Sequence, residues 1–103
     1  MTTDSLANTV DRLRQFRDAR GWAKYHTPRS LAAAITVEAS ELQELYLWGA
    51  EPDVTLVASE IADVMIFALN LCNVLQIDPV WAINAKIDHN ERRRPASDGK
   101  FRT

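Results

Sequence analysis

The sequence lacks the features that mark several common protein classes. It has a single cysteine, Cys72, so no intramolecular disulfide can form. The apolar neighbours of Cys72 favour a small buried side chain over a nucleophile. The formal net charge is -2, which provides no basic surface for duplex nucleic acid. We therefore expect neither a disulfide scaffold nor a nucleic-acid-binding protein.

Long hydrophobic runs are also missing. Glu60 and Asp63 interrupt the most apolar segment, so we expect no membrane-spanning helix and no membrane partner. The first five residues, Met1-Thr-Thr-Asp-Ser, lack the basic start and apolar centre of a secretory signal. We expect a cytoplasmic protein. At 103 residues the chain is one small domain, which we place at residues 1–95, followed by a polar tail at 96–103.

The sequence does contain residues that mark the starts and ends of helices. No segment shows sustained strand alternation. Pro28 and Pro79 follow the good N-cap residues Thr27 and Asp78, which is a helix-start signal. Gly21 and Gly49 follow periodic segments, where glycine commonly ends a helix. The pattern predicts an all-α chain with four helices, at about residues 4–20, 28–48, 52–77 and 79–94.

The predicted third helix is apolar almost all the way round, which is typical of a central helix with partners on several sides. Three other helices in so short a chain can hardly surround it. We therefore expect a homodimer or homotetramer that completes helix bundles. The apolar residues are Leu56, Val57, Ile61, Val64, Met65, Ile66, Leu69, Leu71, Val74 and Leu75.

Two pairs of acids lie inside the most apolar stretches, as Glu38-x-x-Glu41 and Glu60-x-x-Asp63. A spacing of three places both members of a pair on one helix face. Ionised carboxylates among apolar residues need compensation, and an all-carboxylate set suits Mg²⁺ or Mn²⁺. The alternative is that the acids form solvated faces of two amphipathic helices. Glu44 is offset around its helix, where it is a surface acid or supports the site from outside.

Basic residues suited to phosphate lie on the fourth helix. Lys86, Asn90 and Arg93 or Arg94 repeat at about one-turn spacing along one face. The alternative for Arg92–Arg94 is a solvated helix C-terminus, favoured by the helix dipole. A ferritin-like di-iron site is excluded, because neither histidine has a glutamate three residues before it.

These residues together resemble the all-α, MazG-like nucleoside triphosphate pyrophosphohydrolases, most closely the dCTP pyrophosphatase branch. The resemblance covers roughly residues 10–95. The shared stretches are Trp22-x-x-Tyr25-His26-x-Pro28-Arg29-x-Leu31, Glu38-x-x-Glu41-Leu42-x-Glu44-Leu45-x-x-Trp48, Glu60-x-x-Asp63-Val64-x-Ile66 and Lys86-x-Asp88-x-Asn90-x-x-Arg93.

The resemblance implies Mg²⁺-dependent hydrolysis of a nucleoside triphosphate to the monophosphate and pyrophosphate. The acids would hold the metal, and Glu41 is our choice for orienting the attacking water. Lys86, as a catalytic residue, and Arg93 would offset charge on the leaving pyrophosphate. Asn90 would contact sugar, phosphate or water. The implied metal ligands are Glu38, Glu41, Glu60 and Asp63.

The resemblance also implies that Trp22, His26 and Trp48 line the base and sugar pocket, although tryptophans at helix ends and lone histidines are more often structural. Trp81 belongs to no shared stretch and is assigned to the core. Phe67 stands where relatives can carry tyrosine, so its ring can pack on substrate but a hydroxyl contact is lost. The preferred nucleotide is therefore open among dCTP, a modified dCTP and a broader set.

Three rival interpretations remain. The nearest is an all-α dUTPase-like or broad-specificity pyrophosphatase, which shares the acid pairs but selects another base. The second is a non-catalytic helical module for oligomerisation or regulation, in which the acids are surface charges. The third is nucleic-acid binding through Arg92–Arg94, which the net acidic chain disfavours.

Overall fold

The computed structural model describes residues 5–94, and every regular element in that range is helical. The helices are α1 (Leu6–Ala19), the short 3₁₀ helix η1 (Ala23–Tyr25), α2 (Pro28–Glu44), α3 (Val54–Leu75) and α4 (Pro79–Arg93). The all-α prediction is confirmed. The predicted polar tail at 96–103 lies outside the described residues.

The two proline-marked helix starts are confirmed. At α2 the Thr27 hydroxyl accepts the Ser30 N–H at 3.1 Å, and the Ser30 hydroxyl accepts the Thr27 N–H at 3.2 Å. This reciprocal capping box satisfies two N–H groups that no helical carbonyl can reach. At α4 the Asp78 carboxylate accepts the N–H groups of Val80 and Trp81, at 2.9 and 3.3 Å.

Two predicted boundaries around the α2–α3 turn are wrong. Helix α2 ends at Glu44 rather than 48, because the chain then tightens into bonds that reach only three residues back. Leu45 N–H donates to the Leu42 carbonyl at 3.2 Å, and Tyr46 N–H to that of Gln43 at 3.0 Å. Trp48 therefore lies beyond α2 rather than at its last turn.

The other wrong boundary is the start of α3. It begins at Val54 rather than 52, because Asp53 and not the segment before Pro52 provides the cap. The Asp53 side chain accepts the Thr55 N–H at 2.8 Å, which satisfies one of the N–H groups exposed at the start of the helix.

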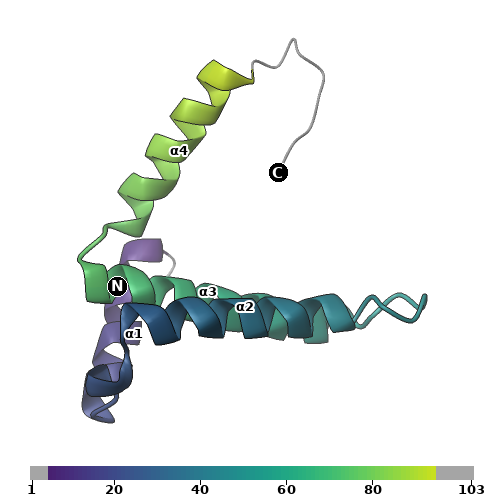
Figure 1. The fold of residues 1–103 in the computed structure, drawn as a ribbon, viewed down its shortest axis with the longest axis horizontal. Coiled ribbons are helices and arrows are strands. Elements are labelled where there is room, and N and C mark those ends of the chain that lie inside the picture. The colour runs from purple at the N-terminus through teal and green to yellow at the C-terminus, as the bar shows by residue number, and fades with distance from the viewer. Residues whose placement is uncertain (1–4, 95–103) are drawn as a thin grey trace.

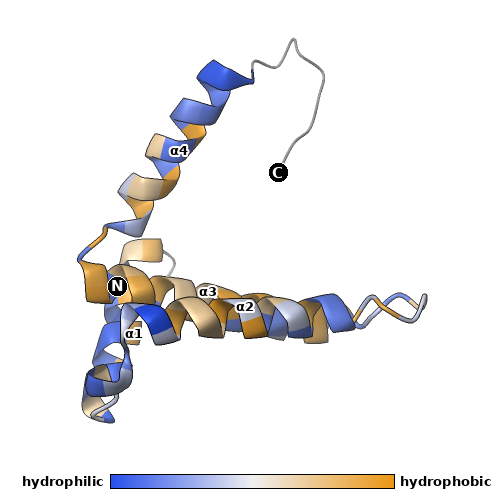
Figure 2. Ribbon diagram, viewed as in Figure 1, coloured by the Kyte–Doolittle hydropathy of each residue, from blue (hydrophilic) through white to orange (hydrophobic). Residues whose placement is uncertain are grey.

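Helices α2 and α3 lie side by side and antiparallel, joined by a turn at one end of the pair (Figure 1). Helix α1 packs on α3 near the opposite end, whereas α4 rises away from the pair. Among residues 5–94, Leu31 on α2 and Leu69 on α3 are the only buried hydrophobic side chains. Figure 2 shows hydrophobic residues along α3 and on the first turns of α4. Within this range a single copy thus encloses very little core.

Helix α3 is long and apolar enough, by length and composition, to cross a membrane. This corrects the expectation that Glu60 and Asp63 remove the segment from that class. A single helix of this kind is weak evidence for a membrane protein, because a central helix of a soluble protein meets the same criterion. Both acids lie in the middle of the helix, which would be costly in lipid.

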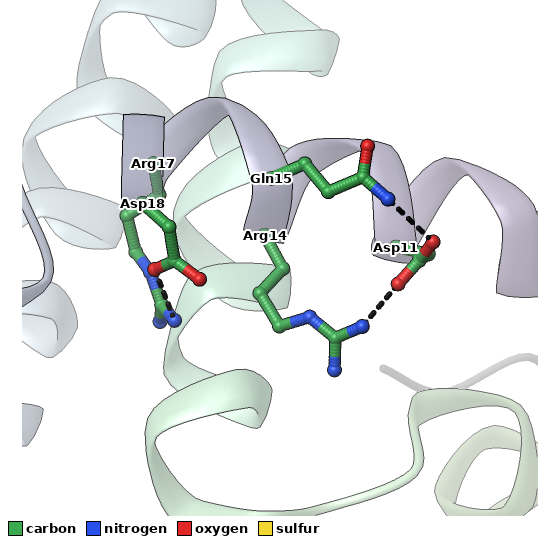
Figure 3. A network of polar contacts seen from close by, with 5 residues as sticks. All are labelled: Asp11, Arg14, Gln15, Arg17 and Asp18. Carbon is green, nitrogen blue, oxygen red and sulfur yellow. Dashed lines mark hydrogen bonds and ion pairs between the residues drawn. The ribbon is translucent and has the colours of Figure 1, made fainter. Parts of the chain in front are cut away.

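Helix α1 is stabilised by polar contacts along its own length (Figure 3). Arg14 and Gln15 both donate to the Asp11 carboxylate, and Arg17 Nε donates to Asp18 at 3.0 Å. An exposed ion pair three or four residues apart on a helix, as between Asp11 and Arg14, contributes about 0.3–0.5 kcal/mol. Both ion pairs recorded between residues of the 5–94 range are on this helix, so neither reaches the acids of α2 and α3.

Candidate metal centre

The antiparallel pairing of α2 and α3 brings three of the four predicted acids together. Glu38 comes from α2, and Glu60 and Asp63 come from successive turns of α3. Each can offer one carboxylate oxygen such that these oxygens all lie within 4.8 Å of one another. Glu60 and Asp63 are three residues apart and therefore share one face of α3. Because α2 packs against α3, Glu38 can reach the same place.

The carboxyl groups of the centre lie close together, and this crowding contributes to raised pKa values for two of them. A hydrogen bond with Glu41 is the largest cause that raises the pKa of Glu38 from 4.5 to about 7, followed by burial and by the neighbouring charges. Such a bond requires one carboxyl group to keep its proton and donate it. Burial, then the charges of Glu41, Asp63 and Glu44, raises the pKa of Glu60 as well.

The centre also holds polar atoms without partners. Oε2 of Glu38 and Oε2 of Glu60 are buried and accept no hydrogen bond within the described part of the chain. Oxygens left in this way carry a desolvation penalty, and no basic side chain of residues 5–94 forms an ion pair with them. The donor set is oxygen only, and the residues therefore fit a hard divalent cation such as Mg²⁺ or Mn²⁺.

Glu41 lies beside this centre rather than within the group of three. It lines an open cavity of about 620 Å³ at the turn end of the helix pair, together with Glu60. Trp48 lies on the same cavity although it is 88% exposed. The cavity therefore joins one wall of the acidic centre to an indole ring.

The other aromatic residues predicted for the base pocket lie elsewhere. Trp22 packs edge-on against Phe16 of α1, with ring centres 5.6 Å apart, and the Arg20 guanidinium lies 3.6 Å from the centre of the Phe16 ring. Burial and then the charge of Arg17 lower the pKa of His26, whose Nδ1 is buried and has no hydrogen-bond partner among residues 5–94. This group precedes α2, whereas Trp48 follows it.

Helix α2 separates the two groups of aromatic residues. Its 17 residues span about 25 Å, and Figure 1 shows the turn after α2 at the far end of the pair from α1. One copy of the chain consequently does not bring Trp22 and His26 to the cavity that Trp48 lines.

The predicted phosphate-contacting residues are not at the centre either. Lys86, Asn90 and Arg93 all lie on α4, which points away from α2 and α3 (Figure 1). Phe67 is half-buried on α3, one turn beyond Asp63. The acids and Phe67 are therefore positioned by the α2/α3 pair, and the basic residues are not.

Comparison with known proteins bears on what this centre does. No protein-family model matches the chain. A solved pyrophosphatase from Archaeoglobus fulgidus is 42% identical in sequence, with a TM-score of 0.75, and the match covers 87% of this chain and 92% of that one. The chain belongs to the MazG-like, all-α nucleoside triphosphate pyrophosphohydrolases.

Curated members of the same family match over most of the chain. Human dCTP pyrophosphatase 1 is 33% identical over 92 residues, covering 80% of this chain and 54% of that protein. Rat dCTP pyrophosphatase 1 is 32% identical over 91 residues, covering 79% and 54%. The chain thus spans about half the length of these relatives.

Glu44 was predicted as a surface acid or as one that supports the site from outside, and Asn70 was not among the predicted site residues. Glu44 lines the cavity and acts electrostatically on Glu60; its position three residues after Glu41 was the available signal. Asn70 is 5% exposed on α3, and its Oδ1 has no partner within the described residues. Asn70 continues the Glu60–Asp63–Phe67 stripe of α3 by one turn, and this spacing is already visible in the sequence.

Proposed function

We propose that the chain is a Mg²⁺-dependent pyrophosphohydrolase that cleaves a (deoxy)nucleoside triphosphate to the monophosphate and pyrophosphate, removing unwanted nucleotides from the pool. The observation that carries the proposal is the convergence of Glu38, Glu60 and Asp63 from two helices, with buried oxygens that lack partners. The pyrophosphatase and dCTP pyrophosphatase relatives support the same reaction.

In this proposal Glu38, Glu41, Glu60 and Asp63 hold the cation, with Mn²⁺ as a possible substitute. A cation held by these carboxylates would offset the negative charge of the triphosphate and favour attack by water. Glu41 is the acid best suited to orient and deprotonate that water, because it lines the open cavity and stands just outside the group of three. Crowded acids of this kind would repel a bare triphosphate, so activity should require the cation.

The leaving pyrophosphate needs positive charge of its own. Lys86 and Arg93 of α4 are proposed to supply it, and Asn90, on the same face of the helix, is proposed to contact sugar, phosphate or water. Two basic side chains and an amide on one face of a helix can contact several phosphate groups of one substrate at the same time.

Deoxycytidine nucleotides, either dCTP or a modified dCTP, are the proposed substrates. The names of the mammalian relatives support this choice, and Trp48 supplies an exposed ring on the cavity for stacking a base. Stacking on an aromatic side chain contributes about 1–3 kcal/mol per base. Trp22, His26 and Phe67 are proposed to complete the base and sugar pocket.

The proposal also includes an oligomeric state and a cellular location. Residues 1–95 would form the catalytic domain, working as a homodimer or homotetramer in the cytoplasm without a nucleic-acid or membrane partner. The scarcity of core supports assembly, since only Leu31 and Leu69 are buried hydrophobic side chains among residues 5–94. Sedimentation showing a stable monomer at micromolar concentration would contradict it.

The test is a panel of dNTPs and NTPs with Mg²⁺, read as monophosphate and pyrophosphate released. We expect dCTP to be consumed fastest, and Asp63→Asn to remove activity while Glu51→Gln, an exposed acid in the α2–α3 turn, retains it. Release from dUTP far exceeding that from dCTP would replace the proposed base preference with the dUTPase-like alternative. Unchanged hydrolysis in Asp63→Asn would show that the acidic centre does not hold a cation needed for hydrolysis.

A further inference from the structure

Asn70 of α3 is a buried amide with an unused acceptor. The residue is 5% exposed, and its Oδ1 is buried with no hydrogen-bond partner among residues 5–94. The buried hydrophobic side chains of the same range are Leu31 and Leu69, so the amide lies in an otherwise apolar core. A buried oxygen that accepts no hydrogen bond carries a desolvation penalty that a leucine of similar shape would not. Native proteins contain few such groups, and a ligand is one source of the missing donor.

The place of Asn70 is fixed relative to the acidic centre. It follows Asp63 by seven residues, which is about 10.5 Å along the axis of α3. Leu31 precedes Glu38 by the same number of residues on α2. Because α2 and α3 are antiparallel and oxygens of Glu38 and Asp63 lie within 4.8 Å, Asn70 and Leu31 lie at about the same level of the helix pair. The amide is therefore two turns from the acids, between the same two helices.

The groups along this face of α3 follow the order of the parts of a nucleotide. The acids Glu60 and Asp63 come first, the Phe67 ring lies one turn further, and Asn70 lies one turn beyond Phe67. In a nucleoside triphosphate the sugar separates the α-phosphate from the base. A substrate with its α-phosphate at the acidic centre and its sugar beside Phe67 would bring its base to the level of Asn70.

A groove provides an approach to this part of α3. Ile66 and Leu69 line an open groove of about 300 Å³ between α1 and α3, and the lining of the groove is largely apolar. Residues four apart are neighbours on the surface of a helix, so Asn70 adjoins Ile66. Apolar walls with few polar groups are typical of sites for small aromatic ligands. The Asn70 amide is thus a polar group next to walls that suit the faces of a base.

We propose that Asn70 recognises the base of the substrate: its Oδ1 accepts a hydrogen bond from the exocyclic amino group of cytosine, and its Nδ2 donates to the adjacent ring nitrogen. Asparagine pairs in a similar way with the amino group and a ring nitrogen of adenine in DNA. Uracil presents its acceptor and donor in the reverse order, so it would require the amide to be turned over, with Nδ2 in the buried position of Oδ1. This contact rests on the proposed function.

The test compares dCTP with the deoxyribonucleoside triphosphate of 2-pyrimidinone, which lacks only the 4-amino group. Wild-type protein should favour dCTP in kcat/KM by about tenfold, as expected for one neutral hydrogen bond. Asn70→Leu, which keeps the approximate shape of the side chain, should reduce this ratio to about one. Asn70→Ala should do the same, and it serves as a second variant if Asn70→Leu does not fold by circular dichroism.

The melting temperature of the nucleotide-free protein is a second readout. Asn70→Leu should raise it, because the substitution removes an unsatisfied buried amide from an apolar core. An asparagine with a purely structural role would give the opposite pair of results, a lower melting temperature and an unchanged ratio. An enclosed water that donates to Oδ1 would also leave the ratio unchanged. Either result would overturn the proposal.

Asn73 provides a matched control on the same helix. Its Nδ2 is also buried with no partner among residues 5–94, but it lines a different cavity, together with Val10 of α1 and Ile77. Asn73→Leu should therefore keep the wild-type ratio between dCTP and the 2-pyrimidinone nucleotide. An equal loss of the ratio in both variants would show a general disturbance of α3 and would contradict a specific contact by Asn70.

The contact and the proposed function fail in different ways. If wild-type protein hydrolyses dCTP but shows no preference over the 2-pyrimidinone nucleotide, or if Asn70→Leu keeps that preference, the function holds and the contact is wrong. If wild-type protein hydrolyses no nucleoside triphosphate, the proposed function is wrong and the contact is rejected with it.

Discussion

The α2/α3 pair and α4 both carry the chemistry expected of a triphosphate site, but they differ in what positions it. The acids are held by helix packing within one chain, which brings oxygens of Glu38, Glu60 and Asp63 within 4.8 Å. The basic residues lie on a helix that packs along no other helix of its chain (Figure 1). An acidic cluster that fits a cation is thus formed within a single copy, whereas Lys86, Asn90 and Arg93, the residues proposed to contact phosphate, are not brought to it there.

The largest effect on activity is expected from a substitution in the acidic centre. Glu38→Gln should lower kcat by about 10²- to 10³-fold, comparable with the loss of one preorganised electrostatic group, and should also weaken Mn²⁺ binding. Steady-state kinetics and isothermal titration with Mn²⁺ measure the two. Retained Mn²⁺ affinity in this variant would place the cation elsewhere.

A smaller and more selective loss is expected on α4. Lys86→Ala should lower kcat about 10- to 100-fold while leaving Mn²⁺ affinity and the melting temperature unchanged, because Lys86 is absent from the acidic centre. Arg92→Ala is the matched control on another face of the helix and should behave as wild type. If Lys86→Ala lost Mn²⁺ binding as completely as Glu38→Gln, the two regions would not be separable.

Substitutions of the tryptophans at the two ends of α2 should also have different effects. Trp48→Ala should raise KM for dCTP about tenfold, as expected for one lost stacking contact, with little change in kcat. Trp22→Ala removes the ring contact with Phe16, so it should lower the melting temperature as well. A Trp48→Ala enzyme with wild-type KM would exclude that ring from the base pocket.

The smallest effect is on stability. The pKa of Glu38 is raised from 4.5 to about 7, so the folded chain binds more protons than the unfolded chain between these values. Stability of the metal-free protein should therefore fall as pH rises from 4.5 through 7. Thermal melts should show a decline of a few degrees, weaker in Glu38→Gln and reversed by Mg²⁺ at pH 7.5. A rise in melting temperature over this range would have the wrong sign.

Local sequence signals were sufficient for the helices and for the acidic centre. Thr27 and Asp78 mark helix starts through their own side chains, and a spacing of three places Glu60 and Asp63 on one face whatever the tertiary structure. The boundaries near Trp48 failed because the tightening of the last turn of α2 and the Asp53 cap compete with a simple proline signal.

The spatial grouping of the site was harder to predict. Trp22, Trp48 and Lys86 each lie in a recognisable stretch of sequence, but their separation depends on helix length and on the direction of α4. The chain leaves α3 at Gln76, which is left-handed with φ 58°, and a non-glycine residue gives no turn signal in the sequence.

The central claim is that the acidic centre between α2 and α3 serves a cation-dependent pyrophosphohydrolase. Phosphorus-31 NMR of dCTP incubated with the wild-type protein tests it most directly, because the products identify the bond that is cleaved. We expect resonances of dCMP and pyrophosphate with Mg²⁺ and none when the cation is chelated. Formation of dCDP and orthophosphate, or no hydrolysis of dCTP or any other nucleoside triphosphate with Mg²⁺ or Mn²⁺, would contradict it.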